Sequence, residues 1–418
     1  MEAKIEVVAR REALIKKLKN QSLTLVYAGV PKVASADEDC PFVVNRNFYY
    51  LTGITQANSV LFIVKGNEGP KVYLFIDEFD ELKEKWTGRR LTIEEARDAS
   101  HITDILLTKN LQTKIDETLR EFGQFGEINT IYLDLEKELK IGMGFTTHEF
   151  ASQLQGRFPK VEILDVYDFV IRQRMIKSAG EIAAIRESIA TTDLGLKGIQ
   201  KVLKPGVYEY QLEAIFRYVL KDQMNVEPSF DTIIASGKNA TILHYPNPKD
   251  KIVDGALVLC DLGASSGEYG ADITRDFPAS GKFNPLQKAI YDIVLKVNKD
   301  IIANVRPGVT LLDLQKRTVD LLTTACLENN LFKTADEISK HYFHNVSHHL
   351  GLNTHDAAVR EEPLAAGMVI TVEPGLYFKE FGIGVRIEDD VLVTATGAEN
   401  LSAAIIKEID DVEKALKR

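Results

Sequence analysis

The chain has 418 residues, of which 51 are basic and 61 acidic, giving a formal net charge of −10 at neutral pH. This length fits two or three domains, and the acidic balance argues against a nucleic-acid binder, which usually carries a basic stripe. The three cysteines are odd in number and far apart, so they predict neither a disulfide framework nor a Cys-x-x-Cys metal site. Without a signal-peptide core or a run of about 18 apolar residues, the sequence predicts a cytoplasmic protein with no membrane segment.

The first half of the chain alternates predicted helices and strands, which is typical of a mixed α/β domain. The expected elements, in chain order, are a surface helix over 2–19, a strand over 23–28, an aromatic strand end over 47–53, strands over 59–64 and 71–76, helices over 78–84 and 93–99, and strands over 131–133 and 161–165. The pattern changes near residue 170. We therefore expect an N-terminal domain over 1–170 and a second domain over 171–418.

The second half contains a faint internal repeat. Its first helix is predicted to begin at a capping box formed by Ser178 and Glu181. A Pro-Gly-Val triplet then occurs twice, beginning at Pro205 and at Pro307, each time before a helical pattern. A histidine follows each proline after 39 or 41 residues, and apolar strands carrying carboxylates come next. A duplication of this kind predicts two related halves that contribute ligands to one cleft.

Residues 257–277 are predicted to form a β-hairpin with two acidic residues. If the turn is centred on Ser266-Gly267, Asp261 and Asp272 lie directly opposite each other. Cross-strand partners have Cβ atoms roughly 4.5–5.5 Å apart. Two carboxylates at that distance repel unless one takes up a proton or a metal ion lies between them, and we favour the metal.

Five of the eight histidines lie within residues 341–355. His344 and His348 have a helical spacing that suits zinc, but Asn345 stands where a metalloprotease of that type needs glutamate. The alternative that a single histidine of this segment binds a metal together with carboxylates from elsewhere in the chain remains open. Two later strands supply candidates, because Glu373 ends the first and Glu388 lies beside Arg386 on one face of the second. Arg386 would either form a simple ion pair with Glu388 or orient it as a metal ligand.

The candidate ligands carry a formal charge of about −4, which two divalent ions would neutralise. They are Asp261, Asp272, His348, Glu373 and Glu388. Oxygen-rich ligation with one nitrogen suits Mn²⁺, with Co²⁺ or Zn²⁺ as alternatives. A two-metal site about 3.5–4 Å across clamps a hydroxide and polarises a carbonyl, so the implied reaction is amide hydrolysis. Each acid taken alone would be read as a solvated surface residue.

Several motifs resemble those of the pita-bread metallopeptidases, the family of aminopeptidase P and prolidase. In the second half they are Asp261-Leu-Gly, Ala271-Asp-Ile-Thr-Arg275, His344-x-x-x-His348-x-Leu-Gly-Leu-x-x-His355-Asp356, Val372-Glu-Pro-Gly375 and Val385-Arg-Ile-Glu388. In the first half, residues 10–14, 40–53 and 86–90 resemble the N-terminal domain of aminopeptidase P. The resemblance implies an α/β N-terminal domain followed by an α+β pita-bread (creatinase/aminopeptidase-like) catalytic domain with a pseudo-twofold internal repeat.

The resemblance also implies a role for each matching residue. Asp261 would chelate one metal ion, Asp272 and Glu388 would touch both, and His348 and Glu373 would complete the other. Glu373 would shuttle a proton to the leaving nitrogen. His244 would assist at the scissile carbonyl and His355 would lie near the leaving proline, while His344 and Arg386 match pocket positions. Departures at Asp276, Asn345 and His349 bear on the shape of the pocket.

The expected function is therefore that of a dinuclear metallo-aminopeptidase that removes a residue preceding proline. A prolidase restricted to dipeptides is the rival within the family. A non-enzymatic binding protein or a metal-free, creatinase-like hydrolase on the same fold is disfavoured because all five ligands are present. The resemblance further implies a homo-oligomer, a dimer or tetramer, in which Trp86 reaches a neighbouring subunit's cleft or is simply a local structural residue.

Overall fold

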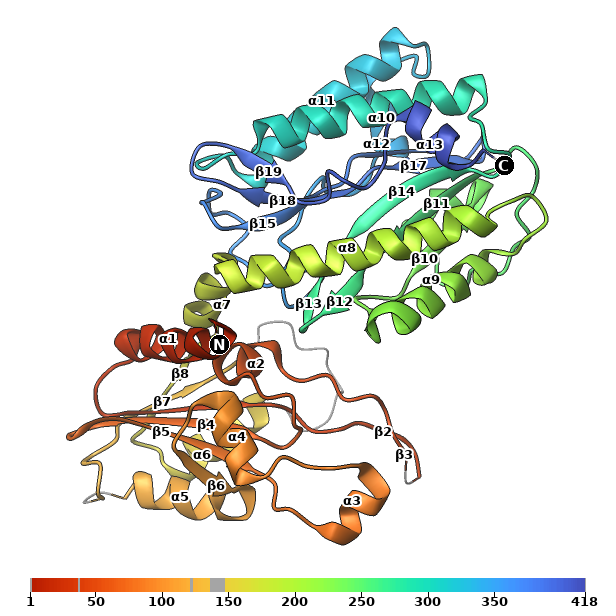
Figure 1. Cartoon of the computed structure of the whole chain (residues 1–418). Coiled ribbons are helices and arrows are strands. Elements are labelled where there is room, and N and C mark those ends of the chain that lie inside the picture. Colours follow the sequence, from red (N-terminus) through yellow and green to blue (C-terminus); the bar gives the residue numbers. More distant parts are fainter. Residues whose placement is uncertain (1, 37, 121–122, 136–146, 418) are drawn as a thin grey trace. The chain divides into compact units, whose positions relative to one another are not determined.

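The computed structural model of the chain describes residues 2–36, 38–120, 123–135 and 147–417. It divides into two compact units, Met1–Arg174 and Met175–Arg418 (Figure 1). No helix within these described ranges is long and apolar enough to cross a membrane. The candidate site lies entirely in the second unit, so the first is described briefly.

The first unit is built on a six-stranded mixed sheet with the strand order β6-β5-β4-β1-β7-β8. Its strands are β1 (Ser22–Tyr27), β4 (Val60–Gly66), β5 (Gly69–Ile76), β6 (Asp104–Leu107), β7 (Thr130–Leu133) and β8 (Glu162–Asp165), with a separate pair formed by β2 (Val33–Ser35) and β3 (Glu38–Asp39). Its α-helices are α1 (Glu2–Lys17), α2 (Arg46–Thr52), α3 (Glu81–Thr87), α4 (Ile93–Ser100), α5 (Leu111–Thr118), α6 (Thr147–Arg157) and α7 (Tyr167–Met175). The alternation of helix and strand expected for this half is present.

The aromatic stretch at 47–53 is a helix, so the prediction of a strand end there was wrong. Asn45 caps the helix by accepting a hydrogen bond from the Phe48 N–H. Gly53 ends it in the left-handed region, at a φ of 70°. The two caps surround only seven residues, too few for a helical period to stand out from an aromatic run.

The second unit contains paired helices and several short sheets. Its α-helices are α8 (Ala179–Val202), α9 (Glu209–Met224), α10 (Pro285–Asn304), α11 (Leu311–Glu328), α12 (Ile338–His341) and α13 (Ile409–Ala415). Its strands are β9 (Glu227–Pro228), β10 (Ile233–Ser236), β11 (Leu257–Leu262), β12 (Ala264–Ser266), β13 (Tyr269–Gly270), β14 (Ile273–Pro278), β15 (Val369–Val372), β16 (Gly375–Phe378), β17 (Ile383–Arg386), β18 (Asp389–Val393) and β19 (Ala398–Asn400). Ser178 and Glu181 form the predicted capping box of α8.

The two Pro-Gly-Val triplets have equivalent backbone partners. In the first, the Gly206 N–H donates to the Ile252 carbonyl and the Ile252 N–H returns a bond to Val207. In the second, Gly308 and Val309 make the same pair of bonds with Leu364. The triplets join α8 to α9 and α10 to α11, and Figure 1 shows α8 and α9 lying side by side. The predicted repeat thus has a structural counterpart in both halves.

The predicted hairpin is present, but its register differs by two residues. Asp261 on β11 pairs with Thr274 on β14, so Asp272 is its diagonal neighbour and not its direct partner. The turn is centred on Gly267-Glu268, whose φ angles of 54° and 69° are both positive. Two positive φ angles are what a tight two-residue hairpin turn requires. Since a shift of two residues keeps each side chain on its face, both carboxylates still point to the same side of the hairpin.

Candidate metal centre and active site

One cavity of about 1280 Å³ in the second unit collects every site residue that the sequence predicted. Those residues are His244, Asp261, Asp272, His344, His348, His355, Glu373, Arg386 and Glu388. They come from the turn that carries His244, the hairpin, the histidine segment and the stretch from Glu373 to Glu388, up to 144 residues apart. The fold therefore brings together all nine.

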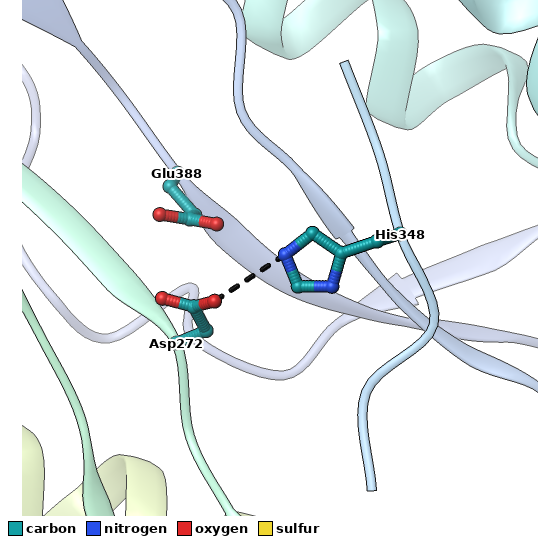
Figure 2. Close-up of side chains that lie close together, drawn as sticks. All are labelled: Asp272, His348 and Glu388. Atoms are coloured by element: carbon teal, nitrogen blue, oxygen red, sulfur yellow. Dashed lines mark ion pairs between the residues drawn. The ribbon is translucent and has the colours of Figure 1, made fainter. Parts of the chain in front are cut away.

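Three of these residues form the centre of the cluster (Figure 2). Single ligand atoms of Asp272, His348 and Glu388 all lie within 4.8 Å of one another. The His348 Nε2 is 3.4 Å from Asp272 Oδ2 and 3.6 Å from Glu373 Oε1. Three predicted carboxylate ligands, those of Asp272, Glu373 and Glu388, thus lie close to the predicted ligand His348.

Hydrogen bonds to backbone groups fix the position and the ring orientation of His348. Its segment runs beside β15, where the Thr371 N–H donates to the His348 carbonyl at 2.9 Å. The His348 Nδ1 lies 3.0 Å from the His349 carbonyl, which can only accept, so Nδ1 carries the hydrogen. In the neutral ring, Nε2 then presents its lone pair to two carboxylates. A lone pair facing carboxylate oxygens is repulsive unless a cation lies between them, and this orientation through a backbone carbonyl is typical of a metal-binding histidine.

The carboxylates of the cluster are buried and close to one another. Burial raises the pKa of Asp272 well above its usual range, and the nearby charges of Asp261 and Asp390 raise it further. Burial, followed by repulsion from Asp272 and Glu373, does the same to the pKa of Glu388. The pKa of Glu373 is also raised, mainly by burial. These groups need protons or cations to be stable in this cavity.

Arg386 contacts Asp261 and not Glu388, so the simple Arg386–Glu388 ion pair considered from the sequence is absent. The Arg386 Nη2 lies 2.5 Å from Asp261 Oδ2, and both side chains are buried. The Arg386 Nε donates to the Thr274 hydroxyl at 3.1 Å, and that hydroxyl donates to Glu388 Oε2 at 2.7 Å. The other oxygen of Asp261, Oδ1, is buried and has no hydrogen-bond partner among the described residues. Asp261 therefore keeps one oxygen available for a cation.

Tyr377 is a site residue that the sequence reasoning missed. Its hydroxyl accepts a hydrogen bond from Arg386 Nη1 at 3.0 Å and so donates to His344 Nε2 at 2.9 Å. The His344 Nδ1 in turn donates to the Asn345 carbonyl at 2.8 Å. Burial, aided by the Arg386 charge, lowers the pKa of His344 to about 3, so the ring is neutral with its hydrogen on Nδ1. No local sequence pattern indicated this role, although Gly375 packs so closely that any Cβ there would lie 2.6 Å from the Tyr377 hydroxyl.

His244 and His355 lie on the exposed side of the cavity. The His355 ring packs edge-on against His348, with 4.4 Å between the ring centroids. Burial lowers the pKa of His355, and the neighbouring His348 and His244 lower it further. A neutral His355 imidazole can exchange hydrogen bonds with a polar substrate beside the buried carboxylates.

The segment that carries His244 is held by Glu209, a second residue that the sequence reasoning missed. Glu209 is fully buried, and its Oε1 accepts hydrogen bonds from the Ser236 N–H, the Ser236 hydroxyl and the Asn239 amide. Its Oε2 accepts from the Asp250 N–H. These bonds fix both ends of the segment. A glutamate in the first turn of an amphipathic helix gave no sequence signal for this role.

Comparisons with known proteins agree with this arrangement. Residues 183–395 match the model of metallopeptidase family M24, and residues 7–124 match that of the aminopeptidase P N-terminal domain. The chain is 31% identical to the Xaa-Pro aminopeptidase of Escherichia coli (98% of this chain, 96% of that one) and 30% identical to human Xaa-Pro aminopeptidase 3 (99% and 86%).

Solved structures show the same fold. The structure of E. coli aminopeptidase P with the inhibitor Pro-Leu has a TM-score of 0.89 at 30% identity, covering 99% of this chain and 98% of that one. Proline aminopeptidase P II from Yersinia pestis has the same TM-score at 31% identity, covering 99% of each. The predicted fold class, an α/β N-terminal domain and a pita-bread domain, is confirmed. The chain belongs to metallopeptidase family M24 and carries an aminopeptidase P N-terminal domain.

Proposed function

We propose that this chain is a dinuclear metal-dependent Xaa-Pro aminopeptidase, which hydrolyses the peptide bond between an N-terminal residue and a following proline. The observation that carries the proposal is the convergence of Asp272, His348 and Glu388 within 4.8 Å, inside a cavity lined by all the other predicted site residues. The similarity over 98% of the chain to a protein named Xaa-Pro aminopeptidase supports the substrate class.

The side chains present fit two divalent cations. Asp261, Asp272, His348, Glu373 and Glu388 would hold them. The His348 Nε2 faces two carboxylates, and Asp261 Oδ1 has no hydrogen-bond partner among the described residues, as cation ligands would. This oxygen-rich set favours Mn²⁺, with Co²⁺ or Zn²⁺ as alternatives, and a zinc-substituted E. coli aminopeptidase P in complex with product has the same fold. When bound, such ions activate water as a nucleophile and polarise a carbonyl.

The chain's own residues bind the substrate and move the proton. Glu373 accepts a proton from the attacking water and delivers it to the proline nitrogen as the bond breaks. Its pKa, raised by burial, makes the protonated form a usable acid. His244 and His355 line the exposed side of the cavity, where His244 would assist at the scissile carbonyl and His355 would lie beside the leaving proline. Arg386 holds Asp261 in place, and His344 is held at the cavity wall by its hydrogen bonds to the Tyr377 hydroxyl and the Asn345 carbonyl.

Proline explains why a dedicated enzyme is needed. Its ring fixes φ and its nitrogen has no hydrogen, so peptidases that bind the amide N–H at the second residue handle it poorly. The rival function is that of a prolidase, which cleaves only dipeptides. A cavity of about 1280 Å³ has room for peptides longer than two residues. Comparing an Xaa-Pro dipeptide with an Xaa-Pro-Xaa tripeptide separates the two functions.

Glu388→Ala tests the metal centre. This variant should lose activity on an Xaa-Pro-Xaa peptide and bind fewer metal ions per chain, measured by inductively coupled plasma mass spectrometry. Glu399→Ala is the matched control, because Glu399 lies in the same unit and forms an exposed ion pair with Arg186. It should keep full metal content and activity. Full activity of the wild-type protein after complete removal of metal would contradict the proposal.

A cytoplasmic location and a homo-oligomeric assembly complete the proposal. The three cysteines are all free, and Cys40 is exposed, which suits a reducing compartment. Trp86 on α3 has an exposed fraction of 85%, so its ring is available to a neighbouring subunit. Light scattering of the purified protein tests the dimer or tetramer that the family resemblance implies.

A further inference from the structure

A buried asparagine outside the predicted site touches the backbone of two proposed metal ligands. Asn298 lies on α10 and has no exposed surface. Its amide nitrogen donates one hydrogen bond to the Val372 carbonyl and one to the Ile387 carbonyl, each at 3.1 Å. Those carbonyls belong to the peptide bonds that precede Glu373 and Glu388. We infer that Asn298 is a positioning residue, which sets the spacing between the two glutamates of the metal centre.

The strand ladder alone holds this spacing weakly, because it is partly interrupted at the two glutamates, where the Ile387 N–H donates to the Pro374 carbonyl at 3.3 Å and Pro374 has no N–H to return a bond. Val372 pairs with Asp389, and Gly375 pairs with Arg386. Continuing the register from one pair to the other puts Glu373 across from Glu388, but these residues belong to no strand. Pro374 contributes to the interruption because it has no N–H to donate.

The two peptide groups before the glutamates find their partners elsewhere. The Glu373 N–H donates to the Val346 carbonyl at 2.8 Å, and the Glu388 N–H donates to the Thr274 carbonyl at 3.2 Å. Their carbonyl groups receive the two hydrogens of the Asn298 amide. Every polar group of both peptide bonds is thereby paired, as burial demands. Asn298 joins the two carbonyls directly, and one of them is the Ile387 carbonyl, to which Pro374 has no N–H to donate.

A third contact fixes the orientation of the amide. The Asn298 Oδ1 accepts a hydrogen bond from the Lys407 ammonium at 2.8 Å. A flipped amide would place its oxygen against two carbonyl oxygens and its hydrogens against an ammonium group, so the assigned orientation is the only one that satisfies all partners. The Lys407 ammonium also bonds Asp389, the residue after Glu388. The inference rests on the proposed metal centre and assigns its outer support.

The test is Asn298→Asp, which keeps an acceptor for Lys407 but removes both hydrogens donated to the carbonyls. The full-length protein is stripped of metal and titrated with Co²⁺, and the binding isotherm and visible absorption spectrum are recorded with and without the substitution. We expect Co²⁺ affinity to fall about 10- to 100-fold, as is typical when a support of metal ligands is lost, with a changed spectrum and a lower kcat on an Xaa-Pro-Xaa peptide.

Two controls keep the result interpretable. Asn304→Asp makes the same substitution at the end of α10, where the amide bonds only Asp300, and it should bind Co²⁺ as the wild type does. Lys407→Met removes the third contact but leaves both carbonyl bonds, so its loss of affinity should be the smaller one. If Asn298→Asp does not fold, Asn298→Ala, which introduces no charge, is measured instead.

The outcomes separate this inference from the proposed function. Wild-type Co²⁺ affinity and spectrum in the folded Asn298 variant would overturn the positioning role while leaving the metal centre intact. Failure of the wild-type protein itself to bind two Co²⁺ ions would overturn the proposed function. A fall in thermal stability of the Asn298 variant with an unchanged Co²⁺ spectrum would mean that the residue is merely structural, and would also overturn the inference.

Discussion

The chain of hydrogen bonds through Tyr377 gives a quantitative prediction for Tyr377→Phe. The substitution removes one oxygen from a side chain with an exposed fraction of 2%. Two bonds are lost, one from the Arg386 guanidinium at 3.0 Å and one to His344 Nε2 at 2.9 Å. A bond to a charged group contributes about 1.5–3 kcal/mol and a neutral one about 1 kcal/mol, so the free energy of unfolding should fall by about 2.5–4 kcal/mol.

Urea unfolding of the metal-free protein, followed by circular dichroism, measures this difference. Tyr291→Phe is the matched control, because the Tyr291 hydroxyl is also buried but donates only to the Lys407 carbonyl at 2.8 Å. Its expected cost is about 1 kcal/mol, the contribution of one neutral bond.

A double-mutant cycle tests whether the Tyr377–His344 hydrogen bond contributes to stability. In a His344→Leu background the Tyr377–His344 bond is already absent, so Tyr377→Phe should cost about 1 kcal/mol less than in the wild type. Tyr291→Phe should cost the same in both backgrounds. The reasoning is refuted if Tyr377→Phe costs the same with and without His344, or if it leaves the free energy of unfolding unchanged.

Two further substitutions test buried charges around the histidine segment. Lys177→Met removes the cation from an ion pair with Asp356 in which both side chains are about 1% exposed. It should lower the free energy of unfolding by about 3–5 kcal/mol in the same urea assay. The control Lys197→Met, in an exposed helical ion pair, should lower it by less than about 1 kcal/mol. Burial lowers the pKa of His349 to about 4, so the unfolded chain takes up the proton first as pH falls and the wild type loses stability. When the pH falls from about 7.5 to about 5, the wild type should therefore lose about 2 kcal/mol of unfolding free energy relative to His349→Phe. A difference between the two proteins that does not change with pH would contradict the lowered pKa of His349.

Most of the site residues were predictable from the sequence because they lie on or beside an apolar strand or in a segment unusually rich in histidine, whereas His244 was indicated by the internal repeat and the family resemblance. Asp261, for example, is the fifth residue of a strand whose other members are buried apolar side chains. Period-two alternation also indicated correctly that Asp261 and Asp272 share one face of the hairpin. A register error of two residues leaves every side chain on the same face of the hairpin, so the two carboxylates were correctly identified although their pairing was wrong.

What could not be predicted depends on contacts across the fold. The turn residue Glu268 has a positive φ, which is uncommon for glutamate, so the neighbouring Ser266-Gly267 was the more natural choice from sequence. Arg386 was placed beside Glu388 because alternation shows only which residues share a face. Its actual partner, Asp261, lies 125 residues away on β11. Tyr377 and Asn298 act through hydrogen bonds that no local pattern encodes.

The interruption at Pro374 explains how segments so distant in sequence become one site. In the register shared by the two strand pairs, Glu373 faces Glu388 at a position between two hydrogen-bonded levels of the ladder, so each glutamate N–H points outward and bonds a segment that carries another proposed ligand. The Glu373 N–H bonds Val346, two residues before His348, and the Glu388 N–H bonds Thr274, two residues after Asp272. The backbone therefore ties the histidine segment to one glutamate and the aspartate hairpin to the other. Pro374 lies between β15 and β16 and is best understood as part of the site, because local rules are broken where function requires it.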